Sequence, residues 1–192
     1  MSEPIKFDPQ KLEKLNNPER IKSLNPDLIW EALNLKNPQI LVDIGAGTGF
    51  FALLFCKKMK QGKIYACDTS DIMVNWMKEN LSNHLNCSII PTKCEESSIP
   101  VADELADLVY FVNVYHELEE SEKILLESLR ILKAKGKIAI IDWKVGETPE
   151  GPPLSHRISE EKVFKDIKNL GFSDIKTHNI LPYHYFFTAE KQ

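Results

Sequence analysis

The chain has 192 residues, of which 43% are hydrophobic and 27% are charged, and its formal net charge is −4 at pH 7. These proportions are typical of a globular protein rather than of a disordered or membrane one. The lysines are scattered among acidic residues, which predicts no nucleic-acid partner. The sequence has neither a signal-peptide pattern nor a run of 18 uncharged apolar residues, so we expect a cytoplasmic protein with no membrane partner.

We expect one domain over residues 1–192, with an N-terminal segment over 1–25. Its four cysteines, Cys56, Cys67, Cys87 and Cys94, contain no CxxC pair. They are predicted to be small buried hydrophobic residues, and no metal site is predicted.

Strand-like and helix-like segments alternate along the chain. Asn25 followed by Pro26 predicts the start of a helix over 25–35. Strands are then expected at 39–44, 63–68, 87–91, 106–114 and 136–143, and helices at 50–59, 70–81, 120–132 and 160–170. Gly171 suits a left-handed helix cap. Residues 172–191 read as two further strands joined near 179–182.

The strands are apolar on both faces and are joined by helices, which predicts a mostly parallel sheet covered on both sides. The connection between the last two strands is too short for a crossover, so this pair should be antiparallel. The predicted fold is therefore a doubly wound α/β domain with a seven-stranded, mostly parallel sheet and an antiparallel hairpin at one edge.

Polar residues gather where the predicted strands end. The first strand ends at Asp43, the second at Asp68 and the fifth at Asp142, while the third and fourth run into "KCEE" and "NVYHE". Ligands of such sheets bind beyond the carboxyl ends of the strands. We therefore expect a binding site along this edge.

The glycine turn "GAGTG" after Asp43 lets the backbone approach a ligand closely. The dinucleotide pattern G-x-G-x-x-G fits poorly, because Phe50 stands where the third glycine is expected. Asp43 would also place a negative charge near a pyrophosphate, and it suits a cationic ligand better. A nicotinamide-dependent oxidoreductase remains an alternative that this pattern disfavours.

The stretch "VDIGAGTGFFA", with an acid ending the next strand in "YACDTS", resembles motifs I and II of class I S-adenosylmethionine-dependent methyltransferases. "EESSIPVADELADLVYFVNVYHELEE" resembles the later motifs of the ubiquinone/menaquinone-biosynthesis type. The resemblance covers roughly residues 28–142. It implies a Rossmann-like methyltransferase fold, S-adenosyl-L-methionine as cofactor and S-adenosyl-L-homocysteine as product.

The resemblance also implies roles for individual residues. Asp43 would lie near the methionine part of the cofactor, Asp68 would accept hydrogen bonds from the ribose hydroxyls, and Glu95 or Glu96 would face the adenine amino group. The full set of cofactor-binding residues expected is Asp43, Gly45, Ala46, Gly47, Asp68, Thr69, Met73, Glu95, Glu96 and Asn113. Met73 can equally be an ordinary core residue of an amphipathic helix.

Methyl transfer needs alignment of the two reactants more than it needs a base. If a base acts, His116 is the candidate, because it follows the fourth strand and its ordinary pKa suits proton removal. "HELEE" is not a zinc-protease motif, since Glu120 replaces the second histidine. A binding protein without transfer activity, such as a regulatory subunit, shares every cofactor motif and stays open.

The acceptor is expected to be a small molecule, because little structure is added to the core fold. Residues 143–158 form a long irregular segment after the fifth strand and are a candidate lid, although a plain crossover loop fits as well. Candidate acceptor contacts are Tyr115, Trp143, His156 and Arg157. Tyr115 can also be a core residue. A homodimer is possible if sheet edges remain uncovered.

Overall fold

The computed structural model describes residues 12–81 and 87–192. The elements are, in chain order, α1 (Leu12–Leu15), α2 (Arg20–Ser23), α3 (Pro26–Leu33), β1 (Ile40–Ile44), α4 (Phe50–Cys56), β2 (Lys63–Asp68), α5 (Asp71–Asn80), β3 (Ser88–Lys93), β4 (Ala106–Val112), the 3-10 helix η2 (Tyr115–Glu117), α6 (Ser121–Ile131), β5 (Leu132–Trp143), the 3-10 helix η3 (Leu154–His156), α7 (Glu160–Asn169), β6 (Ser173–Thr177) and β7 (His184–Glu190).

The strands form one seven-stranded sheet in the order β3-β2-β1-β4-β5-β7-β6. β1 to β5 are parallel, and β7 pairs antiparallel with both β5 and β6, which confirms the predicted fold class. The chain runs outward from β1 through β2 to β3 and then crosses to β4 on the other side of β1. This reversal creates a topological switch point between β1 and β4, where ligands of doubly wound folds bind.

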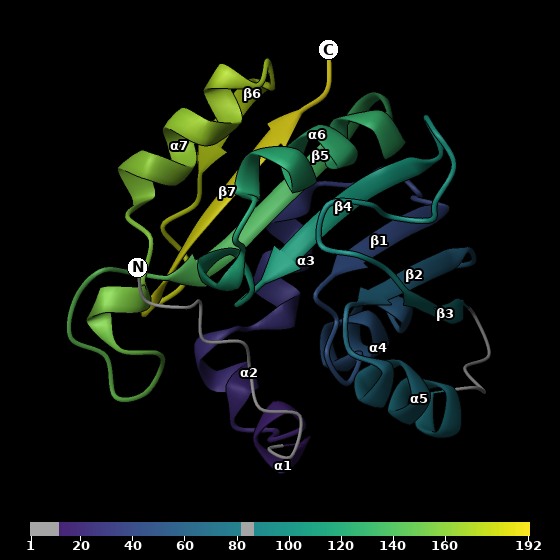
Figure 1. The fold of residues 1–192 in the computed structure, drawn as a ribbon, viewed down its shortest axis with the longest axis horizontal. Helices are drawn as coiled ribbons and strands as arrows, with labels where there is room; N and C mark the ends of the chain where they lie inside the picture. The colour runs from purple at the N-terminus through teal and green to yellow at the C-terminus, as the bar shows by residue number, and fades with distance from the viewer. Residues whose placement is uncertain (1–11, 82–86) are drawn as a thin grey trace.

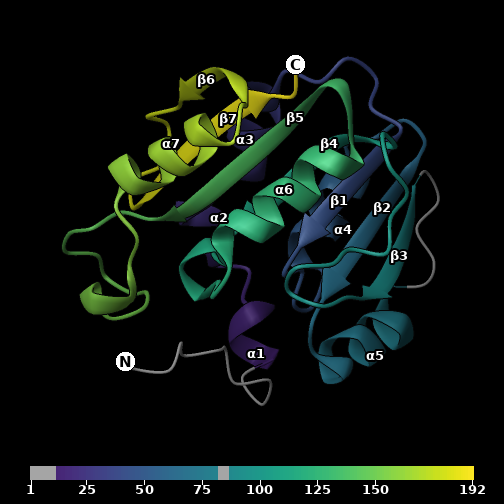
Figure 2. The same ribbon diagram turned by 45° about the horizontal axis from the view of Figure 1, so that its top comes forward.

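Helices cover both faces of the sheet (Figures 1 and 2). α3, α4 and α5 pack on one face around Phe55, Tyr110 and Met77, and α6 and α7 pack on the other around Phe111 and Ile140. The central strands β1 and β4 are buried between these layers and are almost entirely apolar except for Asp43 and Asp107, whereas the edge strands β3 and β6 are partly exposed. All four cysteines are buried with free thiols, as predicted.

Local signals set several boundaries. The Asn25 side chain accepts hydrogen bonds from the backbone N–H groups of Asp27 and Leu28, which confirms the predicted cap of α3. Ser70 caps α5 in the same way. Gly171 follows α7 with a φ of 90°, in the left-handed region that glycine favours.

Two strands are longer than predicted because pairing with a neighbour extends them. β5 begins at Leu132 rather than at 136, since Leu132 pairs with Ala106 across a register shift. β3 continues through Pro91 to Lys93 beside the end of β2. Pro91 is tolerated there because β3 is an edge strand, where a missing N–H leaves no ladder bond unmade.

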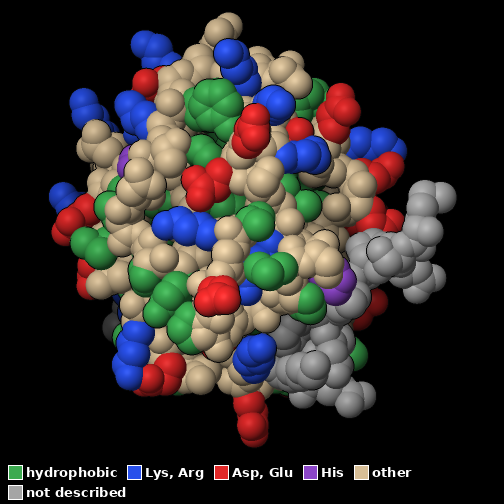
Figure 3. Space-filling view, turned by 90° about the vertical axis from the view of Figure 1, so that its left-hand side faces the viewer, with side chains coloured by type: hydrophobic (Ala, Val, Ile, Leu, Met, Phe, Trp, Pro, Cys, Tyr) green, Lys and Arg blue, Asp and Glu red, His purple; other side chains and the backbone are tan. Residues whose placement is uncertain are grey.

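The exposed surface mixes charges of both signs. Figure 3 shows one face of the molecule, on which basic and acidic side chains alternate instead of gathering into one basic patch. Within the described part of the chain, no helix is long and apolar enough to cross a membrane.

Candidate functional site

A cleft of about 1140 Å³ lies beyond the carboxyl ends of β1, β2, β4 and β5. Its floor is the glycine turn after β1, and further walls come from residues 94–99, from η2 and from the segment after β5. α1 and α2 lie on this same side of the sheet and contribute the remaining wall (Figures 1 and 2). The cleft therefore occupies the switch point that the topology creates.

The glycine turn brings bare backbone to the cleft. Gly45 and Gly47 have φ values of 67° and 57°. A Cβ at Gly45 would come within 2.3 Å of the Val114 side chain, so no larger residue fits. Gly49 is the N-cap residue of α4, and Phe50 begins that helix and lines the cleft. The turn thus places Gly45, Ala46 and Gly47 at the cleft.

Asp43 is the last polar group of β1 and is 3% exposed. Its Oδ2 atom is buried and has no hydrogen-bond partner among the described residues. Burial raises the pKa of this carboxyl to about 8, although the neighbouring Tyr110 hydroxyl and, to a smaller extent, the charge of Arg20 act in the opposite direction. A buried carboxylate without a partner is costly. Asp43 is therefore suited to receive a cationic donor from a ligand in the cleft.

Asp68 ends β2 and closes the glycine turn. Its Oδ2 accepts the N–H of Gly47 at 2.7 Å, and its Oδ1 accepts the N–H of Ser70 at 2.8 Å. Burial raises the pKa of Asp68, while these two hydrogen bonds lower it. Each carboxylate oxygen can accept a second hydrogen bond. Asp68 is thus fixed in position and still able to accept hydroxyl groups.

Three further predicted residues line the cleft around Asp68 and Asp43. Thr69 follows Asp68 directly, and Met73 comes from the first turn of α5 and is buried. Asn113 follows β4 with a φ of 58°, a conformation that is uncommon outside glycine, and its Oδ1 is buried without a partner. A second unpartnered acceptor thus joins Asp43 at the same cleft.

Residues 94–99 form the wall beside Asp68, where Glu95 and Glu96 both line the cleft. Glu95 makes a short backbone bridge with Ser98. The Glu96 carboxylate accepts the N–H groups of Glu119 and Glu120 and so joins this wall to the turn before α6. This contact leaves Glu95 better placed than Glu96 to receive a ligand donor.

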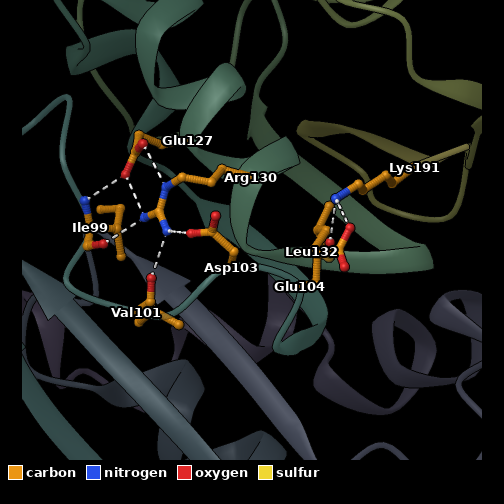
Figure 4. A network of polar contacts seen from close by, with 8 residues as sticks. All are labelled: Ile99, Val101, Asp103, Glu104, Glu127, Arg130, Leu132 and Lys191. Carbon is orange, nitrogen blue, oxygen red and sulfur yellow. Dashed lines mark hydrogen bonds and ion pairs between the residues drawn. The ribbon is translucent and has the colours of Figure 1, made fainter.

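Arg130 of α6 holds the same wall in place (Figure 4). Its guanidinium donates to the carbonyls of Ile99 and Val101 at 2.9 Å each, and it forms a two-point contact with Glu127. Glu127 in turn accepts the N–H of Ile99 at 3.0 Å. Because Ile99 lines the cleft, this network fixes the cleft wall to α6.

His116 and Asp142 form a buried pair at the ends of β4 and β5. His116 Nδ1 lies 2.8 Å from Asp142 Oδ1, and the His116 backbone N–H donates to Asp142 Oδ2 at 3.0 Å. Burial alone would lower the pKa of His116, but the hydrogen bond and charge of Asp142, together with Glu117, raise it overall. With Nδ1 directed at a carboxylate, a neutral His116 carries its lone pair on Nε2. The sequence predicts that Asp142 lies at a strand end, but only the tertiary structure shows that it contacts His116.

The segment after β5 covers part of the cleft with Trp143, Glu150, Pro152 and His156. Figure 1 shows it as the long loop beyond the end of β5. Trp143 packs against His184, with their ring centroids 4.1 Å apart. The placement agrees with the predicted lid, and its opening stays a prediction.

Two predicted acceptor residues do not line the cleft. Arg157 is committed to the loop itself, because it donates to the carbonyls of Lys144, Gly146 and Pro152 and to the Thr148 hydroxyl. The Tyr115 hydroxyl donates to Asp166 of α7 at 2.9 Å, and its ring is 2% exposed. Tyr115 is a core residue, so its assignment as an acceptor contact is wrong.

Comparisons with known proteins agree with this geometry. A family model described as "Methyltransferase domain" matches residues 42–140. The demethylmenaquinone methyltransferase of Bacteroides fragilis is 28% identical over 168 residues, which are 83% of this chain and 67% of that protein. The crystal structure of a SAM dependent methyltransferase from Aquifex aeolicus is 31% identical, covers 97% of this chain and 100% of its own, and has a TM-score of 0.91.

Phosphoethanolamine N-methyltransferase 2 of Haemonchus contortus, solved with S-adenosyl-L-methionine, shares the fold at 16% identity with a TM-score of 0.70, over 88% of this chain and 52% of that one. The family match covers the glycine turn, Asp43, Asp68 and the ends of β1, β2 and β4, and it stops before the end of β5. The family match is a match of sequence, and the Aquifex aeolicus protein shares 31% of its residues with this chain, so both show common family membership and not only a common fold. The chain belongs to the class I S-adenosylmethionine-dependent methyltransferases, and its cofactor is S-adenosylmethionine.

Proposed function

We propose that the cleft binds S-adenosylmethionine through the residues that end β1, β2 and β4. The observation that carries this proposal is a pair of buried acceptors, Asp43 Oδ2 and Asn113 Oδ1, that have no hydrogen-bond partner in the part of the chain that the structure describes. They face the cleft together with a glycine turn too crowded for a side chain. A cationic ligand with an ammonium group supplies the donors that these acceptors lack.

In this proposal Asp43 and Asn113 receive the ammonium of the methionine part. Asp68, held by Gly47 and Ser70, accepts the ribose hydroxyls. Glu95 receives the adenine amino group, and Met73 packs beside the adenosine. The support is the order of these residues along the cleft, which follows the order of the strands β1, β2 and β3.

We also propose that His116 removes a proton from the acceptor. When bound, the cofactor supplies an activated methyl group, whose bond to sulfur breaks as the acceptor attacks and leaves its electron pair on sulfur. His116 Nε2 takes the acceptor proton, and Asp142 holds the ring in that tautomer and stabilises its positive charge. Apolar walls from Phe50, Trp143 and Leu118 exclude water around the acceptor.

The acceptor is proposed to be a small molecule. The support is the relative from Bacteroides fragilis, which is named for methyl transfer to demethylmenaquinone. Profiling methyl transfer to metabolite pools and to purified RNA and protein tests this proposal. Label in small molecules is the expected result, and label in RNA or protein alone would reject it.

A calorimetric titration with S-adenosylhomocysteine tests the cofactor residues. We expect binding in the micromolar range, about −8 kcal/mol, and about 1.5–3 kcal/mol weaker binding by the Asp68→Ala variant. NADH should not bind. An unchanged affinity in Asp68→Ala, or binding of NADH instead, would contradict the assignment.

A further inference from the structure

Arg20 lies outside residues 42–140, which match the family model, and it brings a positive charge into the cleft. It begins α2 in the N-terminal segment, and its side chain lines the cleft beside the start of α4. Nη1 donates to the carbonyl of Leu15 at 2.6 Å. The guanidinium carbon lies 4.9 Å from the ring centre of Phe50 and 5.4 Å from that of Phe51. These contacts hold the guanidinium against the first turn of α4, where Phe50 also lines the cleft.

This charge forms no ion pair with any carboxylate in the described ranges 12–81 and 87–192. Burial lowers the pKa of Arg20 to about 10, and the charges of Asp43 and Glu150 raise it. Arg20 is therefore protonated at neutral pH, and its hydrogen bond to Leu15, the one it makes within the described residues, uses only one of its five N–H donors. A planar guanidinium with spare donors matches the two oxygens of a carboxylate.

Asp43 is the complementary group, because it can accept a donor whereas Arg20 can supply one. Each of the two residues lies near enough for its charge to shift the pKa of the other, yet they do not contact each other. Both line the same cleft, where Asp43 keeps an unpartnered oxygen. An α-amino acid group carries an ammonium and a carboxylate on one carbon, so it can offer its ammonium to Asp43 and its carboxylate to Arg20.

We propose that Arg20 binds the α-carboxylate of the cofactor's methionine part while Asp43 binds its ammonium. The proposal rests on the cofactor site proposed above. Glu150 is the carboxylate that could compete with the ligand for Arg20, because it lies in the segment after β5 and also lines the cleft. Its side chain is exposed and forms no ion pair with Arg20, so the guanidinium stays available to a ligand.

The test compares two ligands that differ only in this carboxylate. S-adenosylhomocysteine and its decarboxylated form, S-adenosyl-3-thiopropylamine, are titrated calorimetrically into the wild type and the Arg20→Met variant. We expect Arg20→Met to weaken S-adenosylhomocysteine binding about ten- to hundredfold, the range of a charged hydrogen bond. The affinity for the amine should not change. Because both ligands meet the same variant, a general loss of structure would weaken both equally.

Three further variants sharpen the comparison. Lys22→Met removes one charge from the same helix, at an exposed side chain that pairs with Glu19, and should change neither affinity. Arg20→Lys should recover part of the lost affinity for S-adenosylhomocysteine. In a Glu150→Gln background, Arg20→Met should still discriminate between the ligands. Equal loss for both ligands, no loss, or a ligand-selective loss that vanishes with Glu150→Gln would overturn the proposal.

Asp68→Ala separates this proposal from the one on which it rests. That variant should weaken both ligands, because both keep the ribose. If Asp68→Ala changed neither affinity, the whole cofactor site would be wrong. If Asp68→Ala weakened both and Arg20→Met did not discriminate between them, the carboxylate site alone would be rejected.

Discussion

Asp43 couples ligand binding to a proton. Its pKa in the free protein is about 8, because burial disfavours the charged carboxylate. An ammonium bound beside it favours that charged form and lowers the pKa, so binding below pH 8 releases a proton. We expect the affinity for S-adenosylhomocysteine to fall as the pH drops below 8, by at most about tenfold per pH unit.

Calorimetry in two buffers of different ionisation enthalpy measures this proton directly. About one proton should leave per ligand bound near pH 6.5 in the wild type, and none from the Asp43→Asn variant, which also binds more weakly at pH 8.5. Binding that is independent of pH in the wild type would show that Asp43 does not receive the ammonium.

The pair His116 and Asp142 gives a second prediction at the scale of the residue. Asp142 raises the pKa of His116 through a 2.8 Å contact, so Asp142→Asn should lower that pKa. An NMR titration of the imidazole resonances follows the change. His178, whose ring bonds to Thr188, is the internal reference and should titrate as before. An unchanged His116 pKa would leave Asp142 without a positioning role.

At the scale of the element, the wall of residues 94–99 depends on α6. Arg130→Met removes the donors to the carbonyls of Ile99 and Val101 and leaves Glu127 without its cationic partner. Since the Arg130 side chain is 32% exposed, water compensates in part, and we expect a loss of about 1–3 kcal/mol in the free energy of unfolding.

Urea denaturation measures this loss, with Lys123→Met as the matched control on the same helix. The exposed pair of Lys123 and Glu120 should contribute less than about 1 kcal/mol. Equal effects of the two substitutions would mean that Arg130 acts as an ordinary surface residue and does not hold the cleft wall.

At the scale of the whole molecule, the cofactor product should stabilise the fold, because the cleft is built from several elements that unfolding separates. At a concentration of 100 times its Kd, S-adenosylhomocysteine adds about 2.7 kcal/mol to the free energy of unfolding. For a chain of this size, that raises the Tm by roughly 5–11 °C. Differential scanning calorimetry checks the shift, which Asp68→Ala should reduce by at least about half at the same concentration and which NADH should not produce.

The sequence by itself determined the alternation of strands and helices, the antiparallel last pair and the strand-end positions of Asp43 and Asp68. These follow from local patterns, because an apolar run, a capping residue such as Asn25 and a glycine turn act within a few residues of one another. The strand ends that are far apart in the chain could be placed together because parallel strands end at one edge of the sheet.

Only the tertiary structure decided which side chains meet. Tyr115 and His116 are neighbours in sequence, yet one bonds to Asp166 in α7 and the other to Asp142 in β5. Arg20 carries no local signal, since a single arginine in a short helix is ordinary, and its place in the cleft depends on how α2 packs against α4. Local patterns fix the direction of the chain, whereas the partner of a side chain depends on residues that only the complete fold brings near it.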